Sequence, residues 1–340
     1  DSTDNDGTVA DIGIYPYLND YSGPDWFITE DGNDITADGS IDSPFRSIQS
    51  AVNFGSDGDT AYVADGTYNE TIVYRNFIGK SVNILGESIE NTIIDPNQDD
   101  AGVRISWSSL SPIQIANLSI QNAGGIVGAG IDINGLNMSP INIENLHIKN
   151  CSSETAGGAI KVTSNNQIVS IENVLIENND ASAGGGIYFS PFGDGSNSSL
   201  TISNTILKQN STSSRGGGIW INNGSNLSIT NSEFVSNSAE EIGGGIYSHN
   251  GVLGYVFETQ IRNNIAPEGA GFFIETSSFD IERSVFYANE GGHGSALEMF
   301  QSNVNVVNSN FINNINNNEW GLNSGAIFFH SSPSTFELIN

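Results

Sequence analysis

Residues 200–220 read LTISNTILKQNSTSSRGGGIW, and residues 227–247 repeat the pattern as LSITNSEFVSNSAEEIGGGIY. Both stretches begin with alternating apolar and polar residues that end on an asparagine, and both finish with three glycines before an apolar pair. Alternation with a period of two predicts short strands, because successive side chains of a strand point to opposite faces. The two stretches therefore predict one all-β unit that the chain uses repeatedly.

The unit can be followed from about residue 113 to the end of the sequence. An apolar anchor, three residues after the asparagine that closes the first strand, recurs at intervals of 25 to 31 residues, at Ile120, Ile148, Ile176, Leu207, Phe234, Ile261, Phe286 and Phe311. Short strands in repeats of this length are typical of stacked coils. We therefore predict a right-handed, single-stranded parallel β-helix of about ten coils.

Asparagine and glycine are abundant for structural reasons in such a fold. From Leu207 onward, each anchor is followed three residues later by an asparagine, at Asn210, Asn237, Asn264, Asn289 and Asn314. Stacked coils place like residues above like residues, so these side chains can form a ladder of amide hydrogen bonds. Glycines suit turns that need a positive φ or close contact between backbones. Cys151 takes the ladder position in an earlier coil, which predicts a buried spacer and not a nucleophile.

Two short motifs carry a family resemblance. GGAI at residues 157–160 and F-x-x-N at residues 234–237, 286–289 and 311–314 resemble the repeat of the chlamydial polymorphic outer-membrane proteins. More broadly, the chain resembles the pectin-lyase-like right-handed β-helix superfamily. Residues 38–51, DGSIDSPFRSIQSA, resemble the opening coil of secreted bacterial β-helix proteins, which implies a short capping helix over residues 43–54. The resemblance covers residues 26–340 and implies a fold, whereas activity must be argued from a site.

The first 25 residues form a separate segment, similar to the tail of a preceding domain in such surface proteins. Within it, Asp4, Asp6 and Asp11 surround a glycine. Calcium takes six to eight oxygen ligands, so a calcium site is one interpretation, and a solvated acidic turn is the other. Residues 26–340 form the β-helix, which we expect to continue beyond residue 340 because the closing FELIN resembles an incomplete strand.

Charge excludes several classes of partner. The sequence contains ten Lys and Arg residues and 39 Asp and Glu residues, which gives a net charge of -29. Such a chain repels phosphate backbones and anionic membrane surfaces, so nucleic acid is not expected as a partner. No apolar run reaches the roughly 18 residues that a membrane span needs. The acidic, lysine-poor composition favours an extracellular or bacterial cell-surface location.

One outward-facing column carries the candidate binding residues. In each strand that follows the glycines, the first residue points inward and the second residue points to solvent. These residues form the aromatic column: Asp132, Lys161, Tyr188, Trp220, Tyr247, Phe273, Glu298 and Phe328. Two residues further on lies the flanking column: Asn134, Thr163, Ser190, Asn222, His249, Glu275, Phe300 and His330.

Four consecutive coils carry an aromatic residue in the aromatic column. Sugar rings pack on Trp and Tyr, while neighbouring polar groups bind hydroxyls. We therefore assign polysaccharide binding to Tyr188, Trp220, Tyr247, Phe273, Asn222, His249 and Glu275. Stacked aromatics that only stabilise the sheet are the alternative interpretation. An exposed aromatic stripe is uncommon on a protein without a partner.

Catalysis by a polysaccharide lyase or glycoside hydrolase in the same groove remains an alternative function. Asp132 and Lys161 lie on adjacent coils, as a lyase base and carboxylate would, although an ordinary ion pair also explains them. His249 and Glu275 form the best acid and base pair. Zinc is not expected, because the four histidines are dispersed along the sequence and Cys151 has no companion ligand.

A structural adhesin or stalk is a third function, in which loops or a partner would cover the aromatic column. Open ends are a liability of the architecture, since an uncapped coil exposes a sheet edge. Because nothing in the sequence caps the last coil, we expect association through the C-terminal end of the helix.

Overall fold

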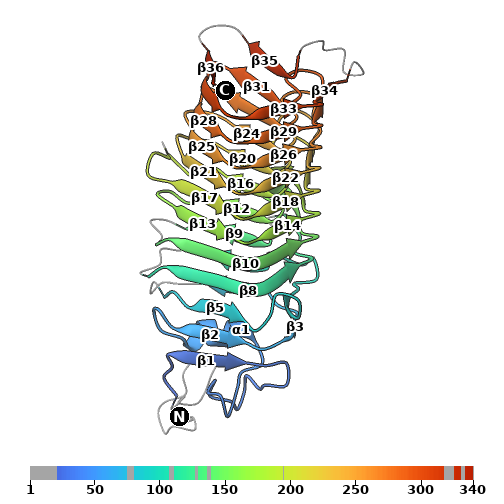
Figure 1. The fold of residues 1–340 in the computed structure, drawn as a ribbon. Helices are drawn as coiled ribbons and strands as arrows, with labels where there is room; N and C mark the ends of the chain where they lie inside the picture. Colours follow the sequence, from blue (N-terminus) through green and yellow to red (C-terminus); the bar gives the residue numbers. More distant parts are fainter. Residues whose placement is uncertain are drawn as a thin grey trace.

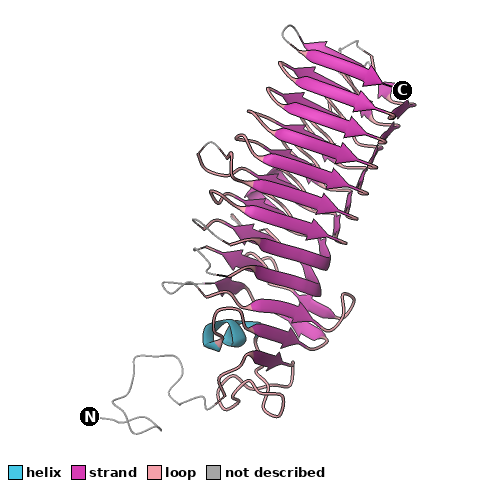
Figure 2. Cartoon of the chain, turned by 60° about the vertical axis from the view of Figure 1, so that its left-hand side comes forward, coloured by secondary structure: helices cyan, strands magenta, loops and turns pink. Residues whose placement is uncertain are grey.

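The computed structural model describes residues 21–339, except 75–79, 107–110, 127–128, 136–138, 194, 318–324 and 331–333. The chain is an all-β parallel solenoid of about nine coils with one short helix, close to the ten coils predicted (Figure 1). Figure 2 shows the coils stacked along one axis, with the helix near the N-terminal end. The chain order of the coils is therefore also their order in space.

The strands lie on three faces, joined by short corner strands. Face 1 carries β1 (Asp25–Ile28), β2 (Thr60–Val63), β5 (Asn83–Gly86), β8 (Ile113–Gln121), β10 (Ile141–Lys149), β13 (Ile168–Glu172), β17 (Ser199–Ser203), β21 (Asn226–Thr230), β25 (Leu253–Phe257), β28 (Ser278–Glu282), β32 (Asn303–Val307) and β36 (Thr335–Ile339). Face 2 carries β3 (Gly66–Tyr68), β6 (Thr92–Ile94), β14 (Leu175–Glu177), β18 (Ile206–Lys208), β22 (Glu233–Val235), β26 (Gln260–Arg262), β29 (Val285–Tyr287) and β33 (Asn310–Ile312). The long strands β8 and β10 contribute to both of these faces.

Face 3 is a ten-stranded parallel sheet and carries the aromatic column. Its strands are β4 (Ile72–Tyr74), β7 (Val103–Ile105), β9 (Ile131–Ile133), β12 (Ile160–Val162), β16 (Ile187–Phe189), β20 (Ile219–Ile221), β24 (Ile246–Ser248), β27 (Phe272–Glu275), β31 (Leu297–Phe300) and β35 (Ile327–His330). The corner strands are β11 (Ser152–Ala156), β15 (Asp180–Ala183), β19 (Ser211–Thr212), β23 (Ser238–Ala239), β30 (Glu290–Gly291) and β34 (Ile315–Asn316).

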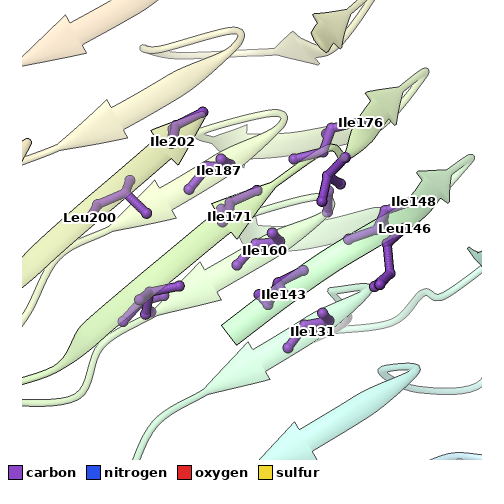
Figure 3. Close-up of a cluster of buried hydrophobic side chains, with 14 of the residues drawn as sticks. Ile131, Ile143, Leu146, Ile148, Ile160, Ile171, Ile176, Ile187, Leu200 and Ile202 are labelled. Atoms are coloured by element: carbon purple, nitrogen blue, oxygen red, sulfur yellow. The ribbon is translucent and has the colours of Figure 1, made fainter. Parts of the chain in front are cut away.

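The core is a stack of apolar side chains that point into the solenoid. The predicted anchors lie in register on face 2, where Ile148 pairs with Ile176 and Ile176 pairs with Leu207. Figure 3 shows isoleucines of faces 1 and 3 meeting in the same interior. Each fully buried aliphatic side chain contributes about 1.5–3 kcal/mol of transfer free energy. Repetition of this layer in every coil holds the three faces together.

Asparagine and glycine make the corners. Asn204 and Asn231, which close the first strand of their coils, have φ values of 51° and 49°. Asparagine tolerates this left-handed region better than most residues, so it bends the chain sharply between faces 1 and 2. At the next corner, a Cβ on Gly217 would lie 2.4 Å from the carbonyl oxygen of Gly244. Glycine is therefore required where the backbones of successive coils touch.

The predicted asparagine ladder is present and runs one coil further toward the N-terminus than expected. The side-chain amide of Asn179 donates to Asn210 Oδ1 at 2.9 Å, and that of Asn210 donates to Asn237 Oδ1 at 2.9 Å. The same side-chain hydrogen bond links Asn237 to Asn264, Asn264 to Asn289 and Asn289 to Asn314, at 2.9–3.1 Å. Each of these amides also donates to a backbone carbonyl of the preceding coil, so the ladder satisfies buried polar groups inside the corner.

Cys151 occupies the ladder position of its coil, as predicted. Its backbone N–H donates to Asn179 Oδ1 at 3.0 Å, and burial raises the pKa of its thiol to about 12. At pH 8 only about one thiol in 10,000 would then be a thiolate. We expect no reaction with Ellman's reagent in the native protein and one equivalent in guanidinium chloride. Rapid labelling of the native protein would contradict the buried-spacer role.

A helix packs against the N-terminal coils. Helix α1 (Ile48–Phe54) begins later than the predicted residue 43, because Ser47 is its N-cap and accepts a hydrogen bond from the Ser50 backbone. The Glu70 carboxylate accepts from the N–H groups of Ile48 and Gln49 at 2.8 and 3.0 Å, which satisfies further free donors of the first turn. The helix packs on β1, β2 and β4. Within the described ranges, no helix is both long and apolar enough to cross a membrane.

The last coil is more exposed to solvent than the earlier coils. Strand β36 pairs with β32, and β35 pairs with β31. Phe329 and Leu338 are 43% and 50% exposed, whereas the equivalent positions of earlier coils are buried. The expected association through this end stays a prediction.

Candidate functional site

The aromatic column lies in one register on face 3, as predicted. Tyr188 pairs with Trp220, Trp220 with Tyr247, and Tyr247 with Phe273. Their ring centroids are 5.1, 5.7 and 5.9 Å apart, and the first two pairs meet edge to face. The column continues to Asp132 and Lys161 at one end and to Glu298 and Phe328 at the other.

The expected exposure of this column is wrong for two of its four aromatic residues. Tyr188 and Trp220 are partly exposed, but Tyr247 is 0% and Phe273 4% exposed. Arg215, in the turn before β20, lies over the Tyr247 ring at 5.5 Å from its centroid. Phe273 lies between Tyr247 and His330, whose ring centroids are 5.9 and 6.3 Å from its own. Neighbouring side chains therefore cover half of the stripe.

His249 and Glu275 of the flanking column meet beside Tyr247. His249 Nδ1 lies 3.2 Å from Glu275 Oε2, and the Tyr247 hydroxyl donates to the same oxygen at 2.5 Å. Arg215 Nη1 donates to the Tyr247 hydroxyl oxygen at 3.3 Å. Burial, together with the Glu275 carboxylate, raises the pKa of Tyr247, so the phenol stays protonated. The sequence pattern found this group except for Arg215, which directly precedes the glycines of its coil and pairs in register with Ile242 of the next coil.

Asp132 and Lys161 also lie together, in a buried ion cluster. Lys161 Nζ is 4.0 Å from Asp132 Oδ1, and Arg104 Nε is 3.5 Å from Oδ2. Asn134 donates to Oδ2 at 2.9 Å. Burial raises the pKa of Asp132, while Lys161 and Arg104 oppose that rise. Arg104 was missed, although the column extended by one coil contains it, since Arg104 pairs with Asp132.

A third group contradicts the expectation that the histidines are dispersed. His293 and His330 lie on either side of Glu298, and one ligand atom from each of the three falls within 4.8 Å of the others. Glu298 is 0% exposed, and its Oε2 accepts from the Gly269 N–H at 2.7 Å. Burial and the nearby Glu268 carboxylate raise the pKa of Glu298 to about 8. Residues one coil apart in sequence become neighbours in space, which a scan for short metal motifs does not detect.

Face 1 has a hollow of about 780 Å³ that the sequence did not reveal. It crosses β21, β25, β28, β32 and β36 and is lined both by polar residues and by apolar ones such as Leu253, Tyr255 and Phe336. The proposed calcium ligands Asp4, Asp6 and Asp11 lie outside the described residues.

Comparison with known families agrees with this geometry. The family model described as the right handed beta helix region matches residues 78–266 and 159–340, which is more than half of the chain. The chain belongs to the right-handed β-helix family. This β-helix is 36% identical over 85 residues to pectate lyase PEL9 of Emericella nidulans, a match that covers 21% of the chain. The matched segment spans about one fifth of that lyase, 20% of its length.

Solved structures share the fold at low identity. The β-helix superposes on XylC, solved in complex with xylose, with a TM-score of 0.53 and 9% identity over 84% of this chain and 69% of XylC. It also resembles PfbA, a surface adhesin of Streptococcus pneumoniae, with a TM-score of 0.43 and 13% identity over 78% of this chain and 76% of PfbA. At such identities the likeness concerns the fold alone.

Proposed function

We propose that this β-helix binds a neutral polysaccharide on face 3, around Tyr188 and Trp220, without catalysing a reaction. The observation that carries the proposal is the partial exposure of these two rings in edge contact. Asn222 follows Trp220 by two residues, and His249 and Glu275 lie beside Tyr247 in the next coils. Aromatic faces bind the apolar faces of sugar rings, and the polar groups suit sugar hydroxyls. The binding surface is therefore shorter than the full aromatic column.

Hydrogen-bonding capacity and charge narrow the ligand class. Trp220 Nε1 and Asn222 Oδ1 are buried and have no hydrogen-bond partner within the protein, so a ligand would satisfy them only if neighbouring side chains moved aside. The net charge of -29 opposes unassisted binding of polyanions. A neutral glycan meets both conditions.

A secreted or cell-surface location, in a bacterium, fits this function. The acidic, lysine-poor composition suits that setting. The partial match to a pectate lyase is in keeping with a carbohydrate ligand.

The double substitution Tyr188→Ala/Trp220→Ala tests the proposal. Loss of two stacking rings should weaken glycan binding by about tenfold or more, which corresponds to a loss of about 1.4 kcal/mol or more of binding free energy. Binding would be measured on a glycan array and by depletion with insoluble polysaccharides. Tyr255→Ala, which removes a 36% exposed aromatic from face 1, is the matched control and should leave binding unchanged.

Each outcome assigns a function. Binding that Tyr255→Ala abolishes, and the double substitution does not, would move the site to face 1. The absence of any bound glycan would favour the adhesin or stalk, a function with which the burial of Tyr247 and Phe273 also agrees.

A polysaccharide lyase or hydrolase is favoured by one observation, the contact of His249 and Tyr247 with the same oxygen of Glu275. The same glycan incubations, monitored for unsaturated products and new reducing ends, distinguish this function. Product formed by the wild type and lost in Glu275→Gln would establish catalysis and overturn the binding-only proposal.

A further inference from the structure

His293, Glu298 and His330 form a group of side chains at the C-terminal end of face 3. Glu298 lies in the aromatic column of β31, and His330 lies in the flanking column of the next strand, β35. His293 comes from the turn before β31. His330 Nε2 contacts Glu298 Oε1, and His293 Nδ1 lies 3.9 Å from the same oxygen. Two imidazole nitrogens and one carboxylate oxygen therefore converge on one point.

The Glu298 carboxylate has no strong cation to balance it. It is completely buried, and within the described chain its only ion-pair partners are the two histidines. The nearest further charge acting on it is the carboxylate of Glu268, which has the same sign. A fully buried carboxylate is normally paired with Arg or Lys, or with a metal ion. The buried carboxyl group of this site is therefore neutralised either by a proton or by a bound metal ion.

Hydrogen bonding in the group is also incomplete. His293 Nδ1 is buried and has no hydrogen-bond partner, although it is directed toward Glu298. Glu298 Oε2 is held by the Gly269 N–H at 2.7 Å, which leaves Oε1 for the histidine side. Such a second contact fixes the orientation of a metal ligand. The Phe328 ring, 4.6 Å from that of His293, adds an apolar wall.

We propose that His293, Glu298 and His330 bind one divalent transition-metal ion, for which zinc is the natural probe. Two histidines and one glutamate form a common three-residue ligand set for zinc and leave one coordination position open. Ligand atoms of a tetrahedral zinc ion lie about 3.3 Å apart, given bonds of about 2.0–2.1 Å. Here they lie within 4.8 Å, so small side-chain rotations suffice. His293 and His330 are 19% and 30% exposed, so solvent reaches the open position.

The site is independent of the proposed glycan surface. It uses none of the residues Tyr188, Trp220 or Asn222, and it lies at the C-terminal end of the same face. Failure of one proposal therefore leaves the other intact.

The test is a titration of the chelator-treated 340-residue chain with Zn²⁺, followed by calorimetry. Excess Mg²⁺ would occupy nonspecific carboxylate sites, which prefer hard cations. We expect one equivalent of zinc, and visible absorption bands of tetrahedral cobalt when Co²⁺ replaces it. Glu298→Gln and His293→Ala should each weaken binding by about 100-fold or more, since even second-sphere changes cost 10- to 100-fold.

His147→Ala is the matched control, because His147 also contacts a glutamate, Glu177 at 3.0 Å, but without a second histidine. Its zinc affinity should equal that of the wild type. Circular dichroism would verify that each variant is folded, and Glu298→Gln keeps the acceptor for Gly269. The absence of a zinc equivalent in the wild type, or equal binding by His293→Ala, would overturn the proposal.

Discussion

Replacing Asn237 with alanine is expected to lower the free energy of unfolding by about 3–4 kcal/mol, one of the largest effects of any single polar substitution in this chain. Asn237 is completely buried, and its Oδ1 accepts from both the backbone and the side-chain amide of Asn210. Its own amide donates to the Leu207 carbonyl oxygen and to Asn264 Oδ1. Alanine removes all four bonds and leaves the Asn210 backbone N–H inside the corner without its partner, while the Asn210 side-chain amide keeps only its bond to the Ile176 carbonyl oxygen.

Denaturation with guanidinium chloride measures this loss, and Asn226→Ala is the control. Asn226 is exposed at the start of β21, so its replacement should change the unfolding free energy by less than about 0.5 kcal/mol. A difference below about 1 kcal/mol between Asn237→Ala and the wild type would show that water replaces the missing amide, and that the ladder contributes little to stability.

The ladder was predictable because it depends on register alone. Repeats at regular intervals place Asn210, Asn237 and Asn264 above one another, whatever the intervening turn does. The same reasoning located the core anchors, the Cys151 spacer and the order of residues along face 3. A single periodic pattern therefore sufficed for the architecture.

The exposure of the site was not predictable, because it depends on how side chains beside the column are directed. Arg215 and His293 hold the same position, directly before a glycine of their coils, and isolated bridges link this position from coil to coil. The repeat therefore places both residues in register. It does not specify that the Arg215 side chain extends over Tyr247, or that the His293 side chain is directed toward Glu298. Columns on strands can be predicted from repeats, whereas contacts between turns and columns need the structure.

Replacing Arg104 with methionine is expected to cost about 3 kcal/mol of stability at pH 7–8, and less at lower pH. Arg104 and Lys161 are the two cations that oppose the burial of Asp132, which is 0% exposed. Methionine keeps most of the apolar stem and removes the charge. The Asp132 carboxylate then keeps only Lys161 at 4.0 Å and the amide of Asn134.

The sign of the pH dependence follows from the pKa of Asp132, which burial already raises and which the substitution raises further. Below the usual aspartate pKa of about 3.9, this side chain is protonated in both the folded and the unfolded chain, so its burial places no charge in the interior. As the pH rises, the unfolded chain loses the proton first, and each pH unit removes up to about 1.4 kcal/mol until the folded pKa is reached. Because that pKa is higher in the variant, its stability continues to fall after that of the wild type has levelled off.

Urea denaturation of both proteins between pH 5 and 8, above the isoelectric point near 4.1, tests this expectation. Lys208→Met removes a more exposed partner of Glu177 and should cost less than about 1 kcal/mol. Arg104→Met/Asp132→Asn should recover most of the loss, because the buried charge is gone. A penalty that stays constant across this pH range, or that the second substitution does not relieve, would mean that Arg104 acts through its packing, and that the Asp132 cluster is neutral to folding.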